Sequence, residues 1–253
     1  MGILSQWAAA ISGVARKKNP ALMPLRFTNL GTEDANIEFT SIIGAVLQFR
    51  YSTEDPFVNF DYTNDTLSID GGGGYVELVG DNRDLNSDIG QFHTVKGDNI
   101  EVSGSIMTLI YGENITEEEA QVIPHGSTFR QLFKNCTRLT TAPLLPATTL
   151  SQACYDEMFA GCTSLRTAPR LPATILEWRC YSLMFKGCTN LTVAPQLPAT
   201  TLNLACYYEM FMGCTSLTTA PELPATTLTN PGVYYSMFEN CTELTSLDLS
   251  NFD

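Results

Sequence analysis

The sequence predicts a mainly β protein with short helices, in which an N-terminal antiparallel β-sandwich precedes a repeat solenoid of about five coils. Short runs with strand character recur at about ten-residue spacing over residues 23–112. A cysteine-centred motif then returns at a fixed period within residues 113–253. The chain therefore divides into an N-terminal peptide, residues 1–22, and two structural domains.

Residues 1–22 are expected to form an anchor. They carry three bases and no acids, and their apolar side chains fall near one face of a short helix over residues 3–16. An amphipathic segment of this kind is suited to docking onto a partner. The predicted anchor residues are Ile3, Leu4, Trp7, Ile11, Val14, Arg16, Lys17 and Lys18.

Charge is distributed unevenly along the 253 residues, whose net charge is −13. Residues 23–125 carry a net charge of −14, and residues 126–253 carry −2. Acidity of this size repels phosphate backbones, so no nucleic-acid partner is expected. The N-terminal bases follow the apolar run instead of preceding it, so no secretory leader is expected. No apolar run is long enough to span a membrane.

Eight short runs predict the strands of the sandwich, with a barrel as the alternative. These runs are residues 25–28, 37–40, 46–51, 57–62, 66–69, 75–79, 91–95 and 100–103. Residues 70–74, one aspartate and four glycines, predict a flexible hairpin turn. This turn lacks the Lys-Ser/Thr of a phosphate loop, which argues against nucleotide binding.

Two acidic stretches follow the strand pattern. Asp81, Asp84 and Asp88 do not match the calcium-loop spacing and are interpreted as a solvated acidic loop. Thr116 followed by three glutamates predicts a helix start at the joint between the two domains, because acids stabilise the N-terminal end of a helix.

All eight cysteines lie in the repeats. Cys136, Cys162, Cys188 and Cys214 are each 26 residues apart, and Cys241 lies 27 beyond. A disulfide ladder or a metal site is one interpretation, although no Cys-x-x-Cys pair occurs. The favoured interpretation is that these cysteines are small buried residues at equivalent positions of successive coils.

Each repeat is expected to contain two arms. Residues 215–222 are predicted to be extended, with Leu217 pointing inward, because Pro221 and Pro224 exclude a helix. Residues 202–211 are predicted to form a short helical turn that ends at Gly213 with positive φ. One strand-like arm and one helical arm make the coil of a leucine-rich repeat.

Aromatic residues provide the candidate binding positions. Tyr155, Tyr181, Tyr207 and Tyr234 occupy one repeat position, and the favoured interpretation is an internal ladder. The candidate binding residues, which could stack on a sugar, are Trp178, Tyr208 and Tyr235.

The sequence argues against an enzyme. His93 and His125 are the only histidines, and neither a Gly-x-Ser-x-Gly nor a His-Glu-x-x-His motif occurs. Asp156 and Glu157 are adjacent and should diverge, whereas a glycosidase needs carboxylates that face each other. No cofactor, catalytic residue or metal site is therefore expected.

The repeat unit Cys-Tyr-x-x-Met-Phe-x-Gly-Cys-Thr-x-Leu-Thr-x-Ala-Pro-x-Leu-Pro-Ala-Thr-Thr-Leu resembles BspA-type leucine-rich repeats, common in proteins of gut Bacteroides and their phages. The resemblance covers residues 126–253 and implies a right-handed solenoid used for adhesion or surface recognition. Residues 247–253 also resemble the strand of a related bacterial surface repeat. A weaker resemblance, at residues 21–27 and 102–109, links the first half to N-terminal modules of phage-like proteins.

These observations predict a non-enzymatic structural and adhesion protein. The expected protein is a phage virion component, a head or tail fibre assembled in the host cytoplasm and held to other virion proteins by residues 1–22. It would present its repeats to a host-surface glycan or protein. An uncapped last coil favours a homo-oligomer, with a trimer expected. The alternative is a leucine-rich-repeat adhesin or binding module of the bacterial cell surface.

Overall fold

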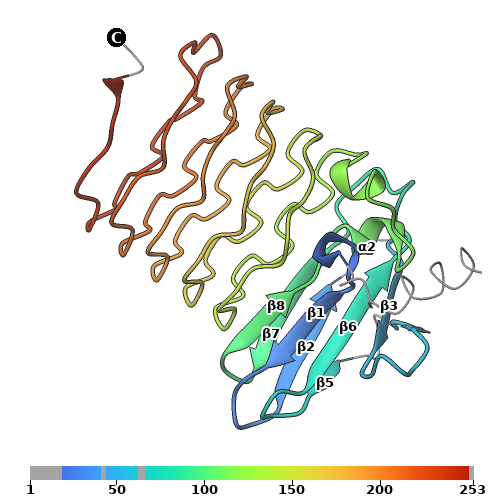
Figure 1. The fold of residues 1–253 in the computed structure, drawn as a ribbon. Coiled ribbons are helices and arrows are strands. Elements are labelled where there is room, and N and C mark those ends of the chain that lie inside the picture. The colour runs from blue at the N-terminus through green and yellow to red at the C-terminus, as the bar shows by residue number, and fades with distance from the viewer. Residues whose placement is uncertain (1–18, 41–43, 62–65, 251–253) are drawn as a thin grey trace, which may run out of the picture.

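The computed structural model describes residues 19–40, 44–61 and 66–250. Two sheets lie at one end of the molecule, and the repeats extend away from them as successive turns of chain stacked side by side (Figure 1). The anchor residues predicted between positions 3 and 18 lie outside the described residues. The last four residues of the predicted anchor, 19–22, are among the described residues. Pro20–Leu22 forms the short 3-10 helix η1 after the N-cap Asn19.

Eight strands, all within the described residues, form two antiparallel sheets. The five-stranded sheet has the order β4-β3-β6-β1-β8, and the three-stranded sheet has the order β5-β2-β7. Each of the eight predicted runs overlaps one of these strands. The strands are β1 Leu25–Asn29, β2 Ala35–Thr40, β3 Leu47–Arg50, β4 Val58–Asn59, β5 Leu67–Ile69, β6 Tyr75–Gly80, β7 Gln91–Lys96 and β8 Ile100–Ser103.

The two sheets share one core. Along β1, Leu25 and Phe27 are fully buried while Arg26 between them is only partly covered, as alternation along a strand requires. The ring of Phe27 lies 5.0 Å from the ring of Phe92 on β7, and Phe39 on β2 lies 4.6 Å from Phe92. The first contact joins β1 of the larger sheet to β7 of the smaller sheet, and the second joins neighbouring strands within the smaller sheet.

The opposite face of the larger sheet carries a buried carboxylate. Glu77 on β6 is only 2% exposed and lies between Arg26 on β1 and Arg50 on β3, its register partners. The Nη2 atoms of Arg26 and Arg50 lie 2.5 and 2.7 Å from its two oxygens. The guanidinium groups also lie 4.0 Å from the Tyr75 ring centre and 4.3 Å from that of Phe57. Glu77 thereby joins three strands.

The prediction of a hairpin at residues 70–74 is wrong. β5 belongs to the three-stranded sheet and β6 to the five-stranded sheet, so this turn carries the chain from one sheet to the other. The two ends of this corner are too tight for side chains, because a Cβ at Gly71 would lie 2.5 Å from the Thr32 carbonyl oxygen, and one at Gly74 2.5 Å from that of Asp70. A glycine run identifies a turn but does not tell which strands it joins.

The joint between the sheets and the repeats contains two short helices, α2 Thr108–Tyr111 and η2 Glu119–Gln121. The predicted helix start at Thr116 is confirmed as a capping box. The Glu119 N–H donates to Thr116 Oγ1 at 3.2 Å, and the Thr116 N–H donates to Glu119 Oε2 at 2.9 Å. Only one 3-10 turn follows this start.

Stacked aromatic rings run through the interior of the repeats. The predicted tyrosine ladder is confirmed, with ring centres of Tyr155, Tyr181, Tyr207 and Tyr234 separated by 5.6 to 6.0 Å. A parallel phenylalanine ladder has separations of 5.4 to 5.7 Å between successive rings from Phe133 to Phe238. Phe92 on β7 stacks on Phe133 at 5.6 Å, so the sheets and the repeats share a continuous core.

Each repeat has a turn arm and an extended arm. We define the turn arms as residues 127–136, 153–162, 179–188, 205–214 and 232–241. We define the extended arms as residues 137–150, 163–176, 189–202, 215–228 and 242–250. Leu217 is fully buried, which confirms that it points inward. The extended arms meet through isolated parallel bridges such as Thr167 with Val193 and Val193 with Thr219.

The prediction of a short helical turn over residues 202–211 is wrong, because the turn arm is a series of tight turns. In the second arm, Ala153, Glu157 and Gly161 have φ of 50°, 57° and 75°, and the other arms repeat this spacing of four. The Met158 N–H donates within its own arm, to Tyr155 O at 3.1 Å. An α-helix cannot contain such left-handed residues at regular intervals.

The left-handed residues direct alternate peptide groups toward the neighbouring repeat. The N–H groups of Tyr155, Glu157 and Phe159 donate to carbonyl oxygens of the next turn arm at 3.1, 2.9 and 2.9 Å. A helix would use these groups for its own hydrogen bonds and leave none for the neighbour. Gly213, predicted to have positive φ, has φ of 74°, which confirms that part of the prediction.

Seven of the eight cysteines are buried, and Cys241 is partly buried, which confirms the favoured interpretation of these residues. The thiols of Cys162, Cys188 and Cys214 each donate to a phenylalanine carbonyl of the preceding turn arm, at 3.0 to 3.1 Å. A cysteine therefore fills a small space and also satisfies a buried acceptor. Burial raises the pKa of the Cys188 thiol to about 12.

Labelling with iodoacetamide at pH 8 is expected to modify Cys241 first and to leave the other seven cysteines unmodified until the protein unfolds. A thiol whose pKa is raised above the buffer pH holds almost no reactive thiolate, and burial also excludes the reagent. Peptide mass spectrometry before and after addition of denaturant measures this. Rapid labelling of Cys188 in the native protein would contradict the packing described for the repeats.

Candidate recognition surface

The three predicted binding residues lie at outward positions on or beside the turn arms. Tyr208 and Tyr235 occupy equivalent places in successive arms, and their rings stack with centres 5.1 Å apart and planes 7° apart. Tyr235 is 58% exposed and Trp178 is 41% exposed, whereas the internal Tyr181 and Tyr207 are 1% exposed. The outer tyrosines therefore form a separate stacked pair that solvent can reach.

Arg179 connects the tryptophan to the tyrosine pair. Its guanidinium lies 6.0 Å from the centre of the Trp178 ring, and its charge also acts on the Tyr208 hydroxyl. A hydrogen bond to the Glu209 carboxylate raises the pKa of Tyr208, and Arg179 opposes this shift. We call the residues Trp178, Arg179, Tyr208, Glu209 and Tyr235 the aromatic–cation surface. Its rings and charges provide stacking faces, donors and an acceptor in one area.

An ion pair with Asp156 holds Arg179 in place. Asp156 is 3% exposed, and its two oxygens lie 3.3 Å from Arg179 Nη2 and 3.5 Å from Arg130 Nε. Burial raises the pKa of Asp156, and the Arg179 charge opposes the rise. Glu209 has its own ion-pair partner, because Lys186 Nζ lies 2.7 Å from Glu209 Oε2. Sequence reasoning missed Arg179 and Glu209, although each directly follows a candidate aromatic residue, Trp178 or Tyr208, and this adjacency was the available signal.

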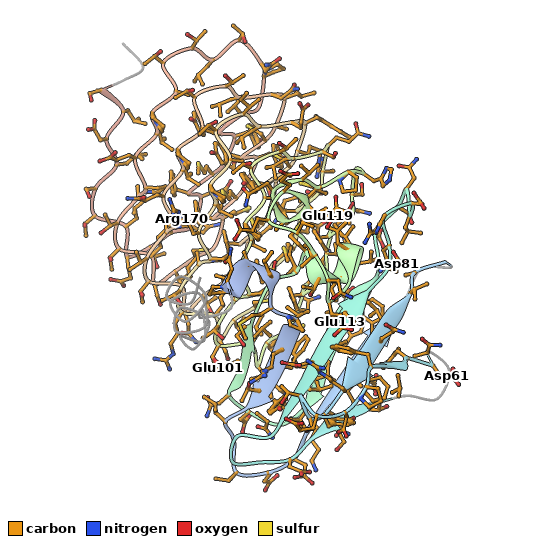
Figure 2. The ribbon with its side chains drawn as sticks, turned by 45° about the vertical axis from the view of Figure 1, so that its right-hand side comes forward. Asp61, Asp81, Glu101, Glu113, Glu119 and Arg170 are labelled. Carbon is orange, nitrogen blue, oxygen red and sulfur yellow. The ribbon has the colours of Figure 1, made fainter. Side chains whose placement is uncertain are left out.

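The groups considered for catalysis have structural partners. His93 Nε2 lies 3.1 Å from the Thr40 hydroxyl, and His125 Nε2 lies 2.8 Å from the Arg83 carbonyl oxygen. Asp81 pairs with Arg83 at 3.5 Å. Among the residues that the structure describes, no three His, Cys, Asp or Glu side chains gather closely enough to hold a metal ion. The labelled acids Asp81, Glu101, Glu113 and Glu119 lie on or near the sheets, while Arg170 lies on the repeats (Figure 2).

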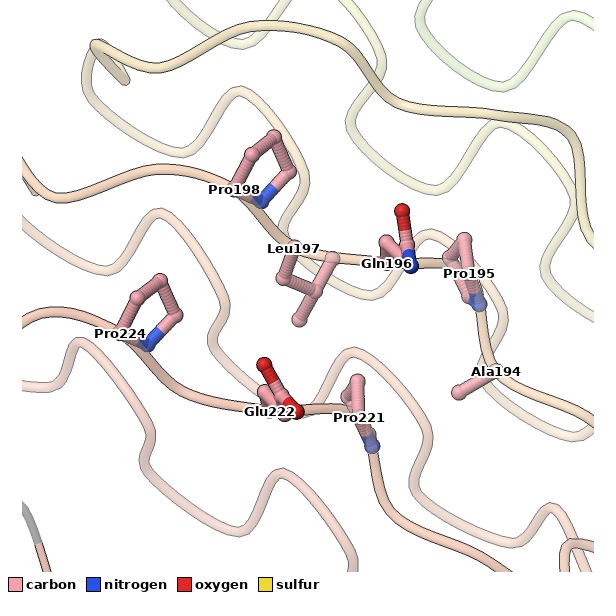
Figure 3. Close-up of a pocket in the computed structure, with 8 residues that line it drawn as sticks. All are labelled: Ala194, Pro195, Gln196, Leu197, Pro198, Pro221, Glu222 and Pro224. Atoms are coloured by element: carbon pink, nitrogen blue, oxygen red, sulfur yellow. The ribbon is translucent and has the colours of Figure 1, made fainter.

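The extended arms carry a second surface feature, which sequence reasoning missed. Two neighbouring Pro-x-Leu-Pro segments lie side by side and line a pocket of about 360 Å³ (Figure 3). Leu197 lies between the two segments, with Gln196 and Glu222 at equivalent places on them. The available signal was the Pro-x-Leu-Pro spacing, which recurs in every complete extended arm.

Comparisons of the chain with protein-family models, with curated proteins and with solved structures find no match. Within the described part of the chain, no helix is both long enough and apolar enough to cross a membrane.

Proposed function

We propose that this chain is a non-enzymatic structural and adhesion protein, a phage virion component of the head- or tail-fibre type. In this proposal the stacked repeats form a leucine-rich-repeat solenoid of about five coils, carried on an N-terminal β-sandwich. Residues 1–22 attach the chain to other virion proteins, and the solenoid presents a surface to a host glycan or protein. A homotrimer would bring three such surfaces together.

The observation that carries this proposal is the outward-facing Tyr208–Tyr235 pair, in which Tyr235 is exposed and Tyr208 half-buried, on a rigid stack of repeats. Two internal ring ladders and regular hydrogen bonds between turn arms hold each repeat against the next. Solenoids of this kind function through extended surfaces instead of enclosed cavities. The pair is stacked before any ligand arrives, so binding does not require these side chains to become ordered.

The chemistry of the aromatic–cation surface favours a carbohydrate ligand. Aromatic faces pack against the C–H faces of sugar rings, while an arginine and a carboxylate bind the hydroxyl groups. The cysteines support a non-enzymatic function, because their buried, protonated thiols serve to pack the repeats.

Substitution of Tyr235 by alanine is expected to weaken glycan binding by up to about tenfold, since loss of a stacking ring removes about 0.5–1.5 kcal/mol of binding energy. The measurement is binding of labelled full chain to an array of purified glycans and to host cells, with Trp178→Ala as a second variant. Leu30→Ala is the matched control, because Leu30 is a 49% exposed apolar residue outside the repeats. Unchanged binding by both aromatic variants, with the control also unchanged, would contradict this assignment of the surface.

A further inference from the structure

The pocket of Figure 3 has a counterpart two repeats earlier in the chain. It lies between the third and fourth extended arms, where Gln196, Pro198, Glu222 and Pro224 help to line it. A second pocket of about 330 Å³ lies between the first and second extended arms. Each of those four residues has an equivalent there, 52 positions earlier, namely Leu144, Pro146, Arg170 and Pro172. The repeat architecture thus places two related pockets on one side of the molecule.

The proline columns explain why pockets form at these places. Proline has no N–H, so neighbouring arms cannot hydrogen-bond through these positions. No backbone hydrogen bond to a neighbouring arm involves residues 194–199, all of which the structure describes. The lining therefore combines apolar proline rings with polar side chains such as Gln196 and Glu222, and its backbone carbonyl acceptors outnumber its N–H donors because each proline lacks one. A ligand that fits must bring apolar side chains together with its own N–H donors.

The spacing of the pockets corresponds to an extended peptide. Parallel strands lie about 4.8 Å apart, so equivalent pockets two repeats apart are separated by roughly 10 Å. A peptide in the polyproline-II conformation places residues i and i+3 on one face, about 9 Å apart. Aromatic side chains suit these pockets, because flat rings pack against the C–H faces of proline rings.

The two pockets differ in charge. Arg170 lines the first pocket and Glu222 the second, and both side chains are exposed. Neither takes part in an ion pair with another of the described residues, so both remain available to a ligand. Opposite charges at the two pockets determine the direction in which a linear ligand that reaches both pockets binds.

We propose that the two proline-lined pockets together bind a linear peptide segment of a partner protein. The peptide is extended, with aromatic residues at i and i+3, an acidic residue beside Arg170 and a basic residue beside Glu222. This site lies on the extended arms and is separate from the aromatic–cation surface. The two proposals therefore succeed or fail independently.

The test is selection of random linear peptides, displayed on a carrier, by the immobilised full chain. We expect enrichment of peptides with two aromatic residues three positions apart, flanked by an acidic and a basic residue. Binding of a selected peptide is then measured by fluorescence anisotropy. Glu222→Arg is expected to weaken peptide binding about tenfold, because the attraction between Glu222 and the basic residue of the peptide becomes a repulsion. Glu243→Arg is the matched control, because Glu243 is an exposed glutamate that does not line either pocket.

The double variant Arg170→Glu, Glu222→Arg distinguishes a change in peptide specificity from a loss of binding that is caused by destabilisation of the fold. It is expected to select peptides with the two charges exchanged, while its circular dichroism and melting temperature match those of the parent. Selected peptides without the aromatic spacing, or selections that do not respond to the charge exchange, would overturn the proposal. Binding of a purified glycan in place of any peptide, with the same loss in Glu222→Arg, would overturn it as well.

Discussion

Replacement of Phe185 by alanine is expected to lower the free energy of unfolding by about 3–5 kcal/mol. The side chain is fully buried, and its ring stacks on Phe159 at 5.7 Å and on Phe211 at 5.6 Å. Its removal leaves a cavity at the middle of the phenylalanine ladder and interrupts contact between successive repeats. Because each repeat is stabilised by its neighbours, we also expect a broader unfolding transition.

Urea unfolding followed by circular dichroism measures this effect. Ile175→Ala is the matched control, since Ile175 is a 59% exposed apolar residue on an extended arm and should change stability by less than about 0.5 kcal/mol. A loss of less than about 1 kcal/mol for the Phe185 variant would mean that the repeats do not depend on this ladder.

Replacement of Glu77 by glutamine is expected to cost about 2–3 kcal/mol of stability. The carboxylate is almost fully covered and accepts from both Arg26 and Arg50, so its neutralisation leaves two guanidinium groups side by side without a counter-charge. Breaking a fully buried pair costs more, but Arg26 is 29% exposed and water screens part of its charge.

Thermal and urea unfolding of Glu77→Gln measure this cost, and Glu38→Gln is the control. Glu38 is an exposed glutamate on β2, so its loss should alter stability by less than about 0.5 kcal/mol. Recovery of stability in the triple variant Glu77→Leu, Arg26→Leu, Arg50→Leu would support repulsion as the cause. Equal stability of Glu77→Gln and the parent would show that the charges on this face are independent.

The sequence predicted the parts of the fold that depend on side-chain burial. Short runs with strand character, such as residues 25–28, recur at about ten-residue spacing and located strands. A fixed repeat position for Tyr155 and its equivalents located an internal ladder. The turn arms were predicted wrongly, because Tyr155, Met158 and Phe159 have the spacing of a helix face. Their left-handed residues include Ala153 and Glu157, types that carry no sequence signal for positive φ.

The candidate surface was predicted in part. Trp178 and Tyr208 do not occupy the repeat position of the internal tyrosine ladder. For this reason they were the better candidates for exposed contacts, and Trp178 is indeed exposed. The role of Arg179 depends on which residue of one repeat lies beside which residue of the next, and a repeat period fixes this only approximately. The proline pockets depend on the same inter-repeat geometry, together with the hydrogen bonds that proline cannot make.

We propose that this chain is a structural component of a virion, held there by residues 1–22. The most direct test is light scattering of the full chain and of a variant lacking residues 1–22, each with and without purified capsid or tail proteins. We expect the full chain to form a stable complex with a virion protein and the truncated chain to form none. Identical masses for both forms, monomeric and unchanged by any virion protein, would contradict it and favour a cell-surface binding module.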